Sequence, residues 1–502
     1  MLVRALTLLL GLGIALAAVA APATAEQTIT VLLPSEFSNL DPVEILSGDQ
    51  TMVMYHVYCR LYTFNDQMEP VPDLVVHESL SPDQKTWTLK LRHGVKFHDG
   101  TPVTAEAVKY TIERMRKKGG SQRVLFQAIT DIGTNGEDTV VLTTGKPFPS
   151  LKNSLAHPNA GLVSEKADRE LADRYSIQPV SCGPYAFKEW LRGARIVVTR
   201  NAGYYGPRPP YDTIRFDFVP EVTTRLFMVQ KGSADIALRL GPAEAKRIEG
   251  SKKVRLLRVE GRNVFYQLNL ALPPTNDLRV RQAINHAVDK NAIIQKVLQG
   301  AGSPARSVLE AMLWGHQVIG TWTYNPDKAR QLLKEAGAEG ARVVLMSPEN
   351  RYLLDSQVSQ AVAGYLRAVG LNVDLKVLGD WAGYIDAIKK KEFNLYMLGW
   401  GGSTGDPDQV LQSLFHSRRA GNLWNLGAYA NKEVDSLIDA GSATFDEAKR
   451  KKIYADAQKR LFEDAPWLFM YRVTSFTAVS DRVKEIHTLQ GPEFHYVFPI
   501  PR

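Results

Sequence analysis

The segment Leu398–Pro407 brings together residue types that suit contact with a small molecule. Its glycines let backbone N–H groups approach a bound molecule closely, and Trp400 offers a flat apolar wall with one N–H donor. Ser403, Thr404 and Asp406 add two hydroxyl groups and a carboxylate. Because the flanking glycines predict a loop and not a packed core, we expect these four side chains to face a ligand.

The same segment also matches a catalytic motif, because Gly401–Gly405 fits the G-x-S-x-G nucleophile elbow of α/β-hydrolases. That motif needs a strand, a tight turn and a helix, with an acid and then a histidine later in the chain. The later partners would come from Asp456, Asp464, His487 and His495. Pro407 and Asp408 would crowd the start of the helix, however, and most of a hydrolase core would precede the nucleophile. We therefore expect no catalytic residue and keep a serine hydrolase as the alternative.

Metal binding is the other chemistry to consider, since the sequence has ten histidines. Neither an H-E-x-x-H motif nor a cluster of cysteine and histidine occurs, so no metal site and no cofactor are predicted. His98 lies in a Phe-His-Asp-Gly turn, where a hydrogen-bonded loop role is expected. His416 follows the binding segment and is the one histidine that we single out as a candidate metal ligand.

The first 25 residues predict export. Arg4 gives a basic start, residues 5–20 are almost wholly apolar, and Ala23-Thr24-Ala25 supplies an A-x-A cleavage site. The apolar run is shorter than the roughly 20 residues that span a bilayer. No cysteine near Ala25 offers a lipid attachment point. We expect a cleavable signal peptide over residues 1–25 and a periplasmic mature protein without a lipid anchor.

Two cysteines, Cys59 and Cys182, are present in a chain predicted to enter an oxidising compartment. Two thiols there often pair, so they are a candidate disulfide, although the sequence gives no distance between them. A two-thiol metal site is the alternative. No C-x-x-C spacing supports redox catalysis.

Composition indicates a large globular protein, with 44% hydrophobic and 23% charged residues in a chain of 502. The formal net charge is +8, but the basic residues are spread along the chain. Short clusters at residues 389–391 and 449–452 lie in helix-like stretches with acidic neighbours, which is typical of a solvated face. A nucleic-acid partner is therefore not expected, while the positive charge mildly favours an anionic ligand.

Strands and helices are interspersed without a repeat of fixed period. Strands are predicted at residues 28–33, 87–91, 214–218, 373–377 and 393–397. Asn325-Pro326 opens a helix that Gly337 can close, and another helix runs from Asp355 to Val369, with Gly370 as its stop. The fold class is therefore α/β, in a mixed α+β form.

A series of motifs carries a resemblance over essentially the whole chain after the export signal. The most specific is residues 91–100, Leu-Arg-His-Gly-Val-Lys-Phe-His-Asp-Gly, and the others are residues 39–42, 183–185, 200–205, 232–235, 277–283 and 324–337. In these blocks the chain resembles the extracellular solute-binding proteins of family 5, which include dipeptide-, oligopeptide-, nickel- and glutathione-binding proteins of ABC importers. Several ordered matches favour a binding protein over an enzyme.

The resemblance implies a two-lobed periplasmic binding protein fold with a hinge and an extra inserted domain. Lobe I would hold residues 26–60, 170–269 and 471–502, the inserted domain residues 61–169, and lobe II residues 270–470. A cleft between the lobes would close on the solute. An inner-membrane ABC permease would then accept the closed protein, which is expected to be a monomer.

The resemblance also implies which residues touch the solute. Peptide-binding relatives follow their Gly-Trp with an aspartate that takes the ligand's amino terminus, and here Ser403 stands in its place. Trp381 falls where dipeptide-binding relatives place a pocket tryptophan, and Arg351 lies within one residue of their carboxylate-binding arginine. A packed tryptophan and a surface salt bridge are the alternatives for these two residues.

Ser403 disfavours ordinary peptides, because a hydroxyl compensates a buried ammonium group poorly. We therefore expect a small polar solute, peptide-like and of glutathione type or anionic. Nickel or a metal chelate is the alternative ligand.

Overall fold

The computed structural model of the chain describes residues 27–44, 48–118, 121–349, 351–379, 381–422, 424–489 and 494–497. The predicted signal peptide, residues 1–25, lies outside these residues. Within them, no helix is long and apolar enough to cross a membrane.

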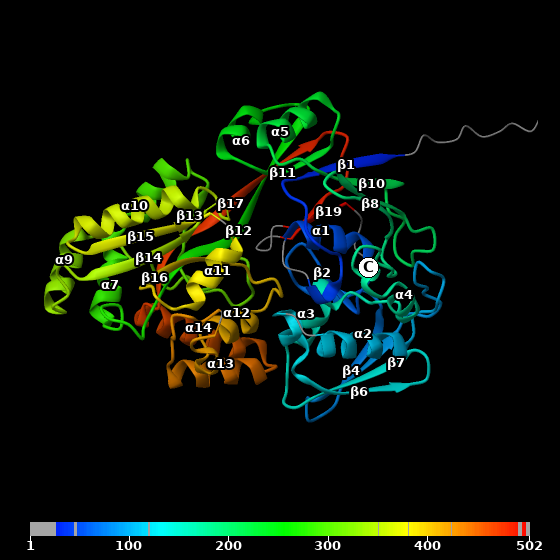
Figure 1. Cartoon of the computed structure of the whole chain (residues 1–502). Helices are drawn as coiled ribbons and strands as arrows, with labels where there is room; N and C mark the ends of the chain where they lie inside the picture. Colours follow the sequence, from blue (N-terminus) through cyan, green and yellow to red (C-terminus); the bar gives the residue numbers. More distant parts are fainter. Residues whose placement is uncertain are drawn as a thin grey trace, which may run out of the picture.

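Helices and strands alternate along the chain, as the predicted mixed α/β class requires (Figure 1). The helices are α1 Gly48–Val57, α2 Ala105–Lys118, α3 Leu151–Ala156, α4 Glu165–Leu171, α5 Val222–Lys231, α6 Pro242–Ile248, α7 Leu278–Ala287, α8 Lys290–Ala292, α9 Pro326–Glu335, α10 Asp355–Ala368, α11 Trp381–Lys389, α12 Pro407–Leu414, α13 Lys432–Ala443 and α14 Glu447–Asp464. The strands are β1 Thr28–Leu33, β2 Tyr62–Phe64, β3 Pro70–Pro72, β4 Val75–Leu80, β5 Thr86–Leu91, β6 Ile129–Asn135, β7 Thr139–Thr144, β8 Tyr185–Leu191, β9 Arg195–Arg200, β10 Thr213–Phe218, β11 Ile236–Leu240, β12 Val254–Leu268, β13 Gly302–Pro304, β14 Arg342–Pro348, β15 Asn372–Leu378, β16 Leu395–Trp400, β17 Trp467–Ser480, β18 His487–Leu489 and β19 Phe494–Tyr496.

Local sequence signals set several of these boundaries. The predicted strand over residues 28–33 is confirmed as β1. The predicted helix after Asn325 is confirmed as α9, and the Asn325 side chain caps it by accepting a hydrogen bond from the backbone N–H of Lys328 at 2.9 Å. The helix α10 ends before Gly370, whose φ of +99° favours glycine.

One large sheet runs through the molecule, in the order β15-β14-β16-β12-β17-β11-β1-β10-β9-β8, with β13 paired to β17. The strand β1 lies parallel to β10 and β11, and β14 lies parallel to β15 and β16. A separate four-stranded sheet has the order β4-β5-β7-β6 and is antiparallel. The sheets therefore combine parallel and antiparallel pairs.

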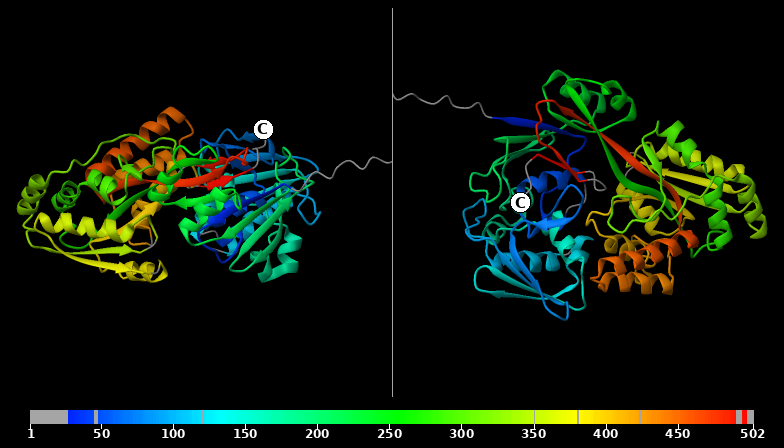
Figure 2. Two further views of the ribbon diagram at one scale, coloured as in Figure 1. Left: turned by 90° about the horizontal axis from the view of Figure 1, so that it is seen from above. Right: turned by 180° about the vertical axis from the view of Figure 1, so that it is seen from behind.

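The long strands β12 and β17 connect the two halves of the large sheet (Figures 1 and 2). They pair antiparallel from Val254 with Ser480 to Gln267 with Trp467, and their register breaks between Glu260 and Asn263. A break of this kind is a β-bulge, which bends the strand and re-aims side chains. The predicted domain boundaries at residues 269/270 and 470/471 remain predictions, and they fall beside and within these strands.

From here on, lobe I means the part built on β1, β8–β10 and the four-stranded sheet, so it includes the predicted inserted domain, residues 61–169, and lobe II means the part built on β14–β16 with helices α7 and α9–α14. A single hydrophobic core fills lobe I and continues into the four-stranded sheet. Lobe II has one core on each face of its sheet, because successive strand residues point to opposite faces. Leu345 and Met397 pack toward α7, α9 and α10, whereas Val344 and Tyr396 pack toward α11–α14.

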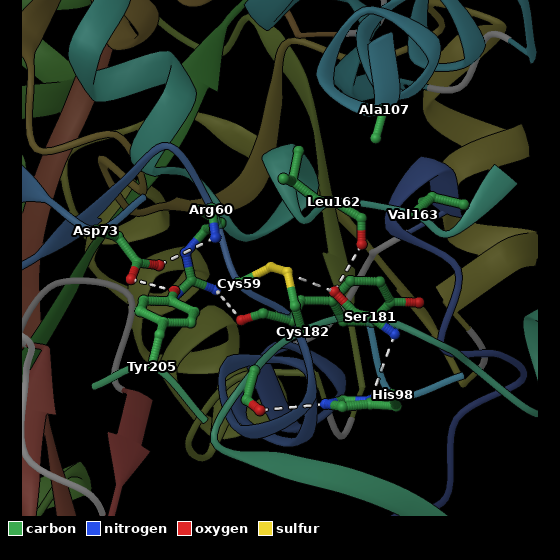
Figure 3. Close-up of a disulfide and its surroundings, with 12 residues drawn as sticks. Cys59, Arg60, Asp73, His98, Ala107, Leu162, Val163, Ser181, Cys182 and Tyr205 are labelled. Atoms are coloured by element: carbon green, nitrogen blue, oxygen red, sulfur yellow. Dashed lines mark hydrogen bonds between the residues drawn. A yellow bond between two sulfur atoms is a disulfide. The ribbon is translucent and has the colours of Figure 1, made fainter. Parts of the chain in front are cut away.

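The structure joins Cys59 and Cys182 in a disulfide within the lobe I core (Figure 3). Their Cα atoms lie 5.1 Å apart although 123 residues separate them in the chain. The Ser181 hydroxyl lies 3.8 Å from the Cys59 sulfur and donates to the carbonyl of Leu162 at 2.6 Å. His98 accepts from the backbone N–H of Ser181 and donates to a neighbouring carbonyl, so its ring braces this loop.

Candidate functional site

The predicted binding segment is a loop between the strand β16 and the helix α12. The Asp406 carboxylate caps α12 by accepting from the backbone N–H of Asp408 at 2.9 Å. Gly405 has a φ of +68°, and a Cβ atom at this position would lie 2.3 Å from the carbonyl oxygen of Met68 in lobe I. Glycine at 405 therefore allows the loop to lie directly against the other lobe.

Asp406 is predicted as a ligand contact, but the structure gives its carboxylate another role. Both carboxylate oxygens accept hydrogen bonds from Arg450 on α14, at 2.7 and 2.8 Å. The two side chains are 5% and 7% exposed. Arg450 also donates to the Ser150 hydroxyl of lobe I at 2.8 Å. The Asp406 carboxylate is thus committed to a buried ion pair that touches both lobes.

Ser403 and Thr404 also contact lobe I. The Ser403 hydroxyl lies 3.0 Å from Nε2 of His157, and the Thr404 carbonyl accepts from the Asn153 side chain at 2.8 Å. We call these two hydrogen bonds, together with that from Arg450 to Ser150, the interlobe contact. In this structure the predicted binding segment therefore contacts lobe I through two polar bonds, and Arg450, which is paired with Asp406, adds a third.

The hydrogen bonds of His157 argue against a serine nucleophile. Its Nδ1 accepts from the backbone N–H of Asn159 at 3.2 Å, so the proton is on Nε2 and is donated to Ser403. The Ser403 hydroxyl in turn donates to the Gln409 side chain at 3.3 Å. Burial lowers the pKa of His157 to about 3. A general base would need to accept the serine proton, and this ring cannot do so.

Trp381, the first residue of α11, and Arg351, in the segment that leads into α10, lie together in lobe II. The Arg351 guanidinium lies 4.9 Å from the centre of the Trp381 ring and 5.6 Å from that of Tyr352. Trp381 also stacks on Tyr384, with ring centres 5.4 Å apart. Arg351 Nε is buried and has no hydrogen-bond partner among the described residues. The structure thus places a guanidinium over an aromatic ring, with one donor that has no partner among the described residues.

Gly399 brings the binding segment against this aromatic cluster. Its backbone N–H donates to the Tyr352 hydroxyl at 2.8 Å. A Cβ atom at Gly399 would lie 2.6 Å from Tyr352 Cε1 and 3.0 Å from Arg262 Cδ. The absence of a side chain at 399 therefore creates the space that Tyr352 and Arg262 fill.

We expect the substitution Gly399→Ala to lower the free energy of unfolding by about 1–3 kcal/mol, because the new methyl group must displace Tyr352 or Arg262. Urea unfolding followed by circular dichroism measures this loss. The control is Gly364→Ala on the exposed side of α10, where nothing lies near the added methyl group. That control should stabilise the helix by about 0.5–1 kcal/mol. Equal effects of the two substitutions would contradict the packing argument.

Sequence reasoning missed Arg262, Arg239 and Asp49. Arg262 lies in the β12 bulge, and Arg239 on β11 binds Asp49 of α1 at 3.0 Å. Burial lowers the pKa of Arg351 most, and Arg262 and Arg239 lower it further, whereas Tyr352 and Asp49 raise it. The glycine at 261, inside a strand pattern, is the one signal that could have indicated the bulge. The other two residues sit in segments without a motif.

Trp400 lies at the end of β16, with its ring centre 5.2 Å from that of Trp424. Its Nε1 is buried and has no hydrogen-bond partner among the described residues. A donor in this position suits an acceptor on a bound molecule.

His416, the candidate metal ligand, is occupied by protein contacts. Its Nδ1 accepts from the backbone N–H of Arg418 at 3.2 Å, and its Nε2 lies 3.3 Å from a carboxylate oxygen of Asp439. No group of three or more metal-ligating side chains is found in the part of the chain that the structure describes. The geometry therefore gives His416 a role in closing the turn after α12.

A cavity of about 480 Å³ lies beside the interlobe contact and is lined from both lobes. Lobe I contributes Lys146 and Ser154, and lobe II contributes Thr404, Gln409 and Arg418. The Asp439 carboxylate lies 3.7 Å from Lys146 and 3.8 Å from Arg418, so this one acid pairs with both cations. The cavity offers mainly neutral hydroxyl and amide groups.

Comparisons with known proteins agree with this architecture. A family model described as bacterial extracellular solute-binding proteins, family 5 Middle, matches residues 69–422. The glutathione-binding protein GsiB of Pectobacterium atrosepticum is 29% identical over 497 residues, with 97% of each chain covered.

Among solved structures, the periplasmic binding protein AgaA of A. tumefaciens R10, in complex with agropinic acid, is 28% identical. It superposes with a TM-score of 0.82 over 94% of this chain and 99% of its own. The ABC transporter-associated periplasmic binding protein DppA of Helicobacter pylori, in complex with peptide STSA, has the same TM-score at 21% identity, over 94% of this chain and 99% of its own. The predicted periplasmic binding protein fold is thereby confirmed. The chain belongs to the bacterial extracellular solute-binding proteins of family 5, and it is a solute-binding protein of an ABC importer and not an enzyme.

Proposed function

We propose that the protein captures a small peptide-like solute that carries a carboxylate, and delivers it to an inner-membrane permease. The observation that carries this proposal is the Arg351 guanidinium, which lies on Trp381 with a buried, unpaired Nε. Such a group suits a carboxylate, because it lies beside an aromatic ring and one of its donors has no other partner among the described residues. The Trp400 ring and its unpaired Nε1 supply an apolar wall and a second donor.

The names of the relatives support the same class of solute. GsiB is called a glutathione-binding protein, and AgaA is in complex with agropinic acid. We propose ligand contact for Arg351, Trp381 and Trp400, and a role in joining the lobes for Ser403, Thr404 and Asp406. Because His157 donates to Ser403, that hydroxyl gives an ammonium group little compensation, and ordinary dipeptides are disfavoured.

Isothermal titration calorimetry tests this function. We expect stoichiometric binding of reduced glutathione or a similar acidic peptide, with much weaker binding of the neutral amide of a dipeptide. The nickel complex of histidine is included as the alternative ligand, and its tight binding would favour the hypothesis that the solute is a metal chelate. The finding that no small molecule binds, and that none is released from the purified protein in mass spectrometry, would overturn solute capture.

We also propose that the protein is exported by cleavage after Ala25 and remains a soluble periplasmic monomer. The apolar segment over residues 5–20 and the A-x-A site support this. The intact mass of the protein isolated from the periplasm should correspond to a chain that begins at Glu26. A lipid-modified mass or an uncleaved N-terminus would contradict the proposal.

A further inference from the structure

The lobe I side of the interlobe contact comes from one part of the chain. Its side chains are Ser150, Asn153 and His157, which meet Arg450 and the binding segment of lobe II. All three fall within residues 61–169, the predicted inserted domain. The domain that the family resemblance adds to the two lobes is thus the part that touches lobe II here.

Two more contacts join the same parts of the molecule. The ring of Trp87 on β5 and that of Phe445, in the loop between α13 and α14, have their centres 6.0 Å apart, and Phe445 packs against the lobe I core. Lys146 Nζ lies 3.7 Å from a carboxylate oxygen of Asp439 on α13. We call the lobe I residues of all these contacts the closing surface: Trp87, Lys146, Ser150, Asn153 and His157.

The closing surface lies at the opposite end of the molecule from the strands that connect the lobes. Figure 1 shows β12 and β17 crossing between the lobes at one end and α3 facing α12 at the other, and the view from behind in Figure 2 agrees. Rotation of the lobes about the connecting strands displaces the distant end most. Opening would therefore part the closing surface from lobe II.

Each lobe holds its own face of this contact in place through internal bonds. On lobe II, Arg450 donates twice to Asp406, and on lobe I, Nδ1 of His157 accepts from the backbone N–H of Asn159. If the lobes part, these internal bonds remain, and water replaces the lost partner on each side. Both faces are thus formed in advance, which suits a contact that is made and broken repeatedly.

The two faces also pack incompletely, because the cavity of about 480 Å³ lies between them. Its lobe I lining, which includes Lys146 and Ser154, falls within residues 61–169, and its lobe II lining comes from the binding segment, α12, the turn after α12 and α13. Domains of one chain that meet through small, polar interfaces move relative to each other. The contact is therefore of a kind that separates.

We propose that the closing surface holds the lobes together through contacts that the solute does not make. The predicted inserted domain thereby sets the fraction of molecules that are closed, and it changes the affinity for every solute by the same factor. This inference goes beyond the proposed function, because it concerns the movement of the lobes and holds whichever solute is bound.

Chemical cross-linking measures the contact in protein dialysed free of small molecules. A water-soluble carbodiimide joins a lysine amine to a carboxylate beside it, and the side chains of Lys146 and Asp439 are 50% and 46% exposed, so the reagent reaches both. Mass spectrometry of the digested protein gives the yield of this cross-link. It is divided by the yield for Lys152 with Glu78, a contact within residues 61–169. This ratio reports the fraction of molecules in which the lobes touch.

The test variant is Asn153→Ala/Phe445→Ala, which removes one hydrogen bond and one aromatic contact but keeps the cross-linked pair. We expect the ratio to fall about 3–30-fold, as the loss of two such contacts predicts. The matched control is Asn372→Ala/Phe227→Ala, the same two exchanges at exposed positions on β15 and α5. It should leave the ratio unchanged.

An equal ratio in the wild type and the test variant would overturn the inference. So would a wild type in which Lys152 reacts with Glu78 but Lys146 does not react with Asp439. The single variants of the pair should each give an intermediate ratio, so the test does not depend on the folding of the double variant.

Isothermal titration calorimetry with reduced glutathione gives a second measurement. The test variant should bind glutathione more weakly by a factor similar to the fall in the cross-link ratio. Unchanged affinity together with a lowered ratio would contradict the link between closure and affinity. If glutathione does not bind the wild type, that result counts against the proposed function alone, because the cross-linking needs no solute.

Discussion

Replacing Arg450 with methionine should lower the free energy of unfolding by about 3–5 kcal/mol. Arg450 is 5% exposed and gives two hydrogen bonds to Asp406 and one to the carbonyl of Gly441. Methionine fills a similar volume but leaves the Asp406 carboxylate buried without a cation. Burial and Asp406 already raise the pKa of Asp408, so two acids would then face each other uncompensated.

The double variant Arg450→Met/Asp406→Asn separates lost packing from uncompensated charge. It should be more stable than Arg450→Met alone, because removal of the second charge relieves the burial penalty. Chemical unfolding followed by circular dichroism measures all three proteins. The matched control is Lys449→Met, because Lys449 is exposed and lies one residue earlier on the same helix. This substitution should change the free energy of unfolding only slightly. If Arg450→Met lowers the free energy of unfolding by less than about 1 kcal/mol, the ion pair stabilises the protein no more than a nonpolar side chain of similar volume does.

Arg450 also contacts lobe I, through the Ser150 hydroxyl. The bond from Arg450 to Ser150 belongs to the interlobe contact, together with the bonds of Asn153 and His157. The substitution Ser150→Ala removes this bond while Asp406 keeps its partner. It should cost about 0.5–1.5 kcal/mol of stability, as for a single hydrogen bond.

The elements of the fold are easier to predict from a sequence than the contacts of a site, for a physical reason. Strand and helix signals are local, so β1 and α9 appeared where Thr28–Leu33 and Asn325-Pro326 indicated them. The family motifs also report on packing. Asp41, in an early motif, binds the buried Arg114 at 2.6 and 2.7 Å and so fixes α2 on lobe I.

The site depends on which segments meet, and the sequence does not state this. Asp406 was predicted as a ligand contact because it follows a glycine-rich loop, yet Arg450 takes its carboxylate. Arg239 and Asp49 lie far apart in the chain and carry no motif, although they form an ion pair. Ser403 was singled out because it replaces an aspartate, and the structure shows that its partner His157 comes from the other lobe.

The second prediction with a large effect is that Glu310 makes the stability of the protein depend on pH. This side chain is 1% exposed, and its Oε2 has no hydrogen-bond partner within the described residues. Burial raises its pKa from the ordinary 4.5 to about 7, against the opposing influence of backbone groups and Arg262. Because each pKa unit is worth about 1.4 kcal/mol, the ionised form should cost the folded protein about 3 kcal/mol.

The sign follows from which state binds the proton. Between pH 4.5 and 7 the folded protein keeps the Glu310 proton and the unfolded chain has lost it, so stability falls as the pH rises through this window. The substitution Glu310→Gln removes that dependence. Relative to the wild type, the variant should gain about 3 kcal/mol on going from pH 4.5 to pH 8, as measured by urea unfolding at both pH values. The exposed Glu339→Gln should show no such gain. A Glu310→Gln difference that is equal at both pH values would mean that Glu310 is ionised throughout, and thus that Arg262 and the backbone near Gly402 already compensate its charge.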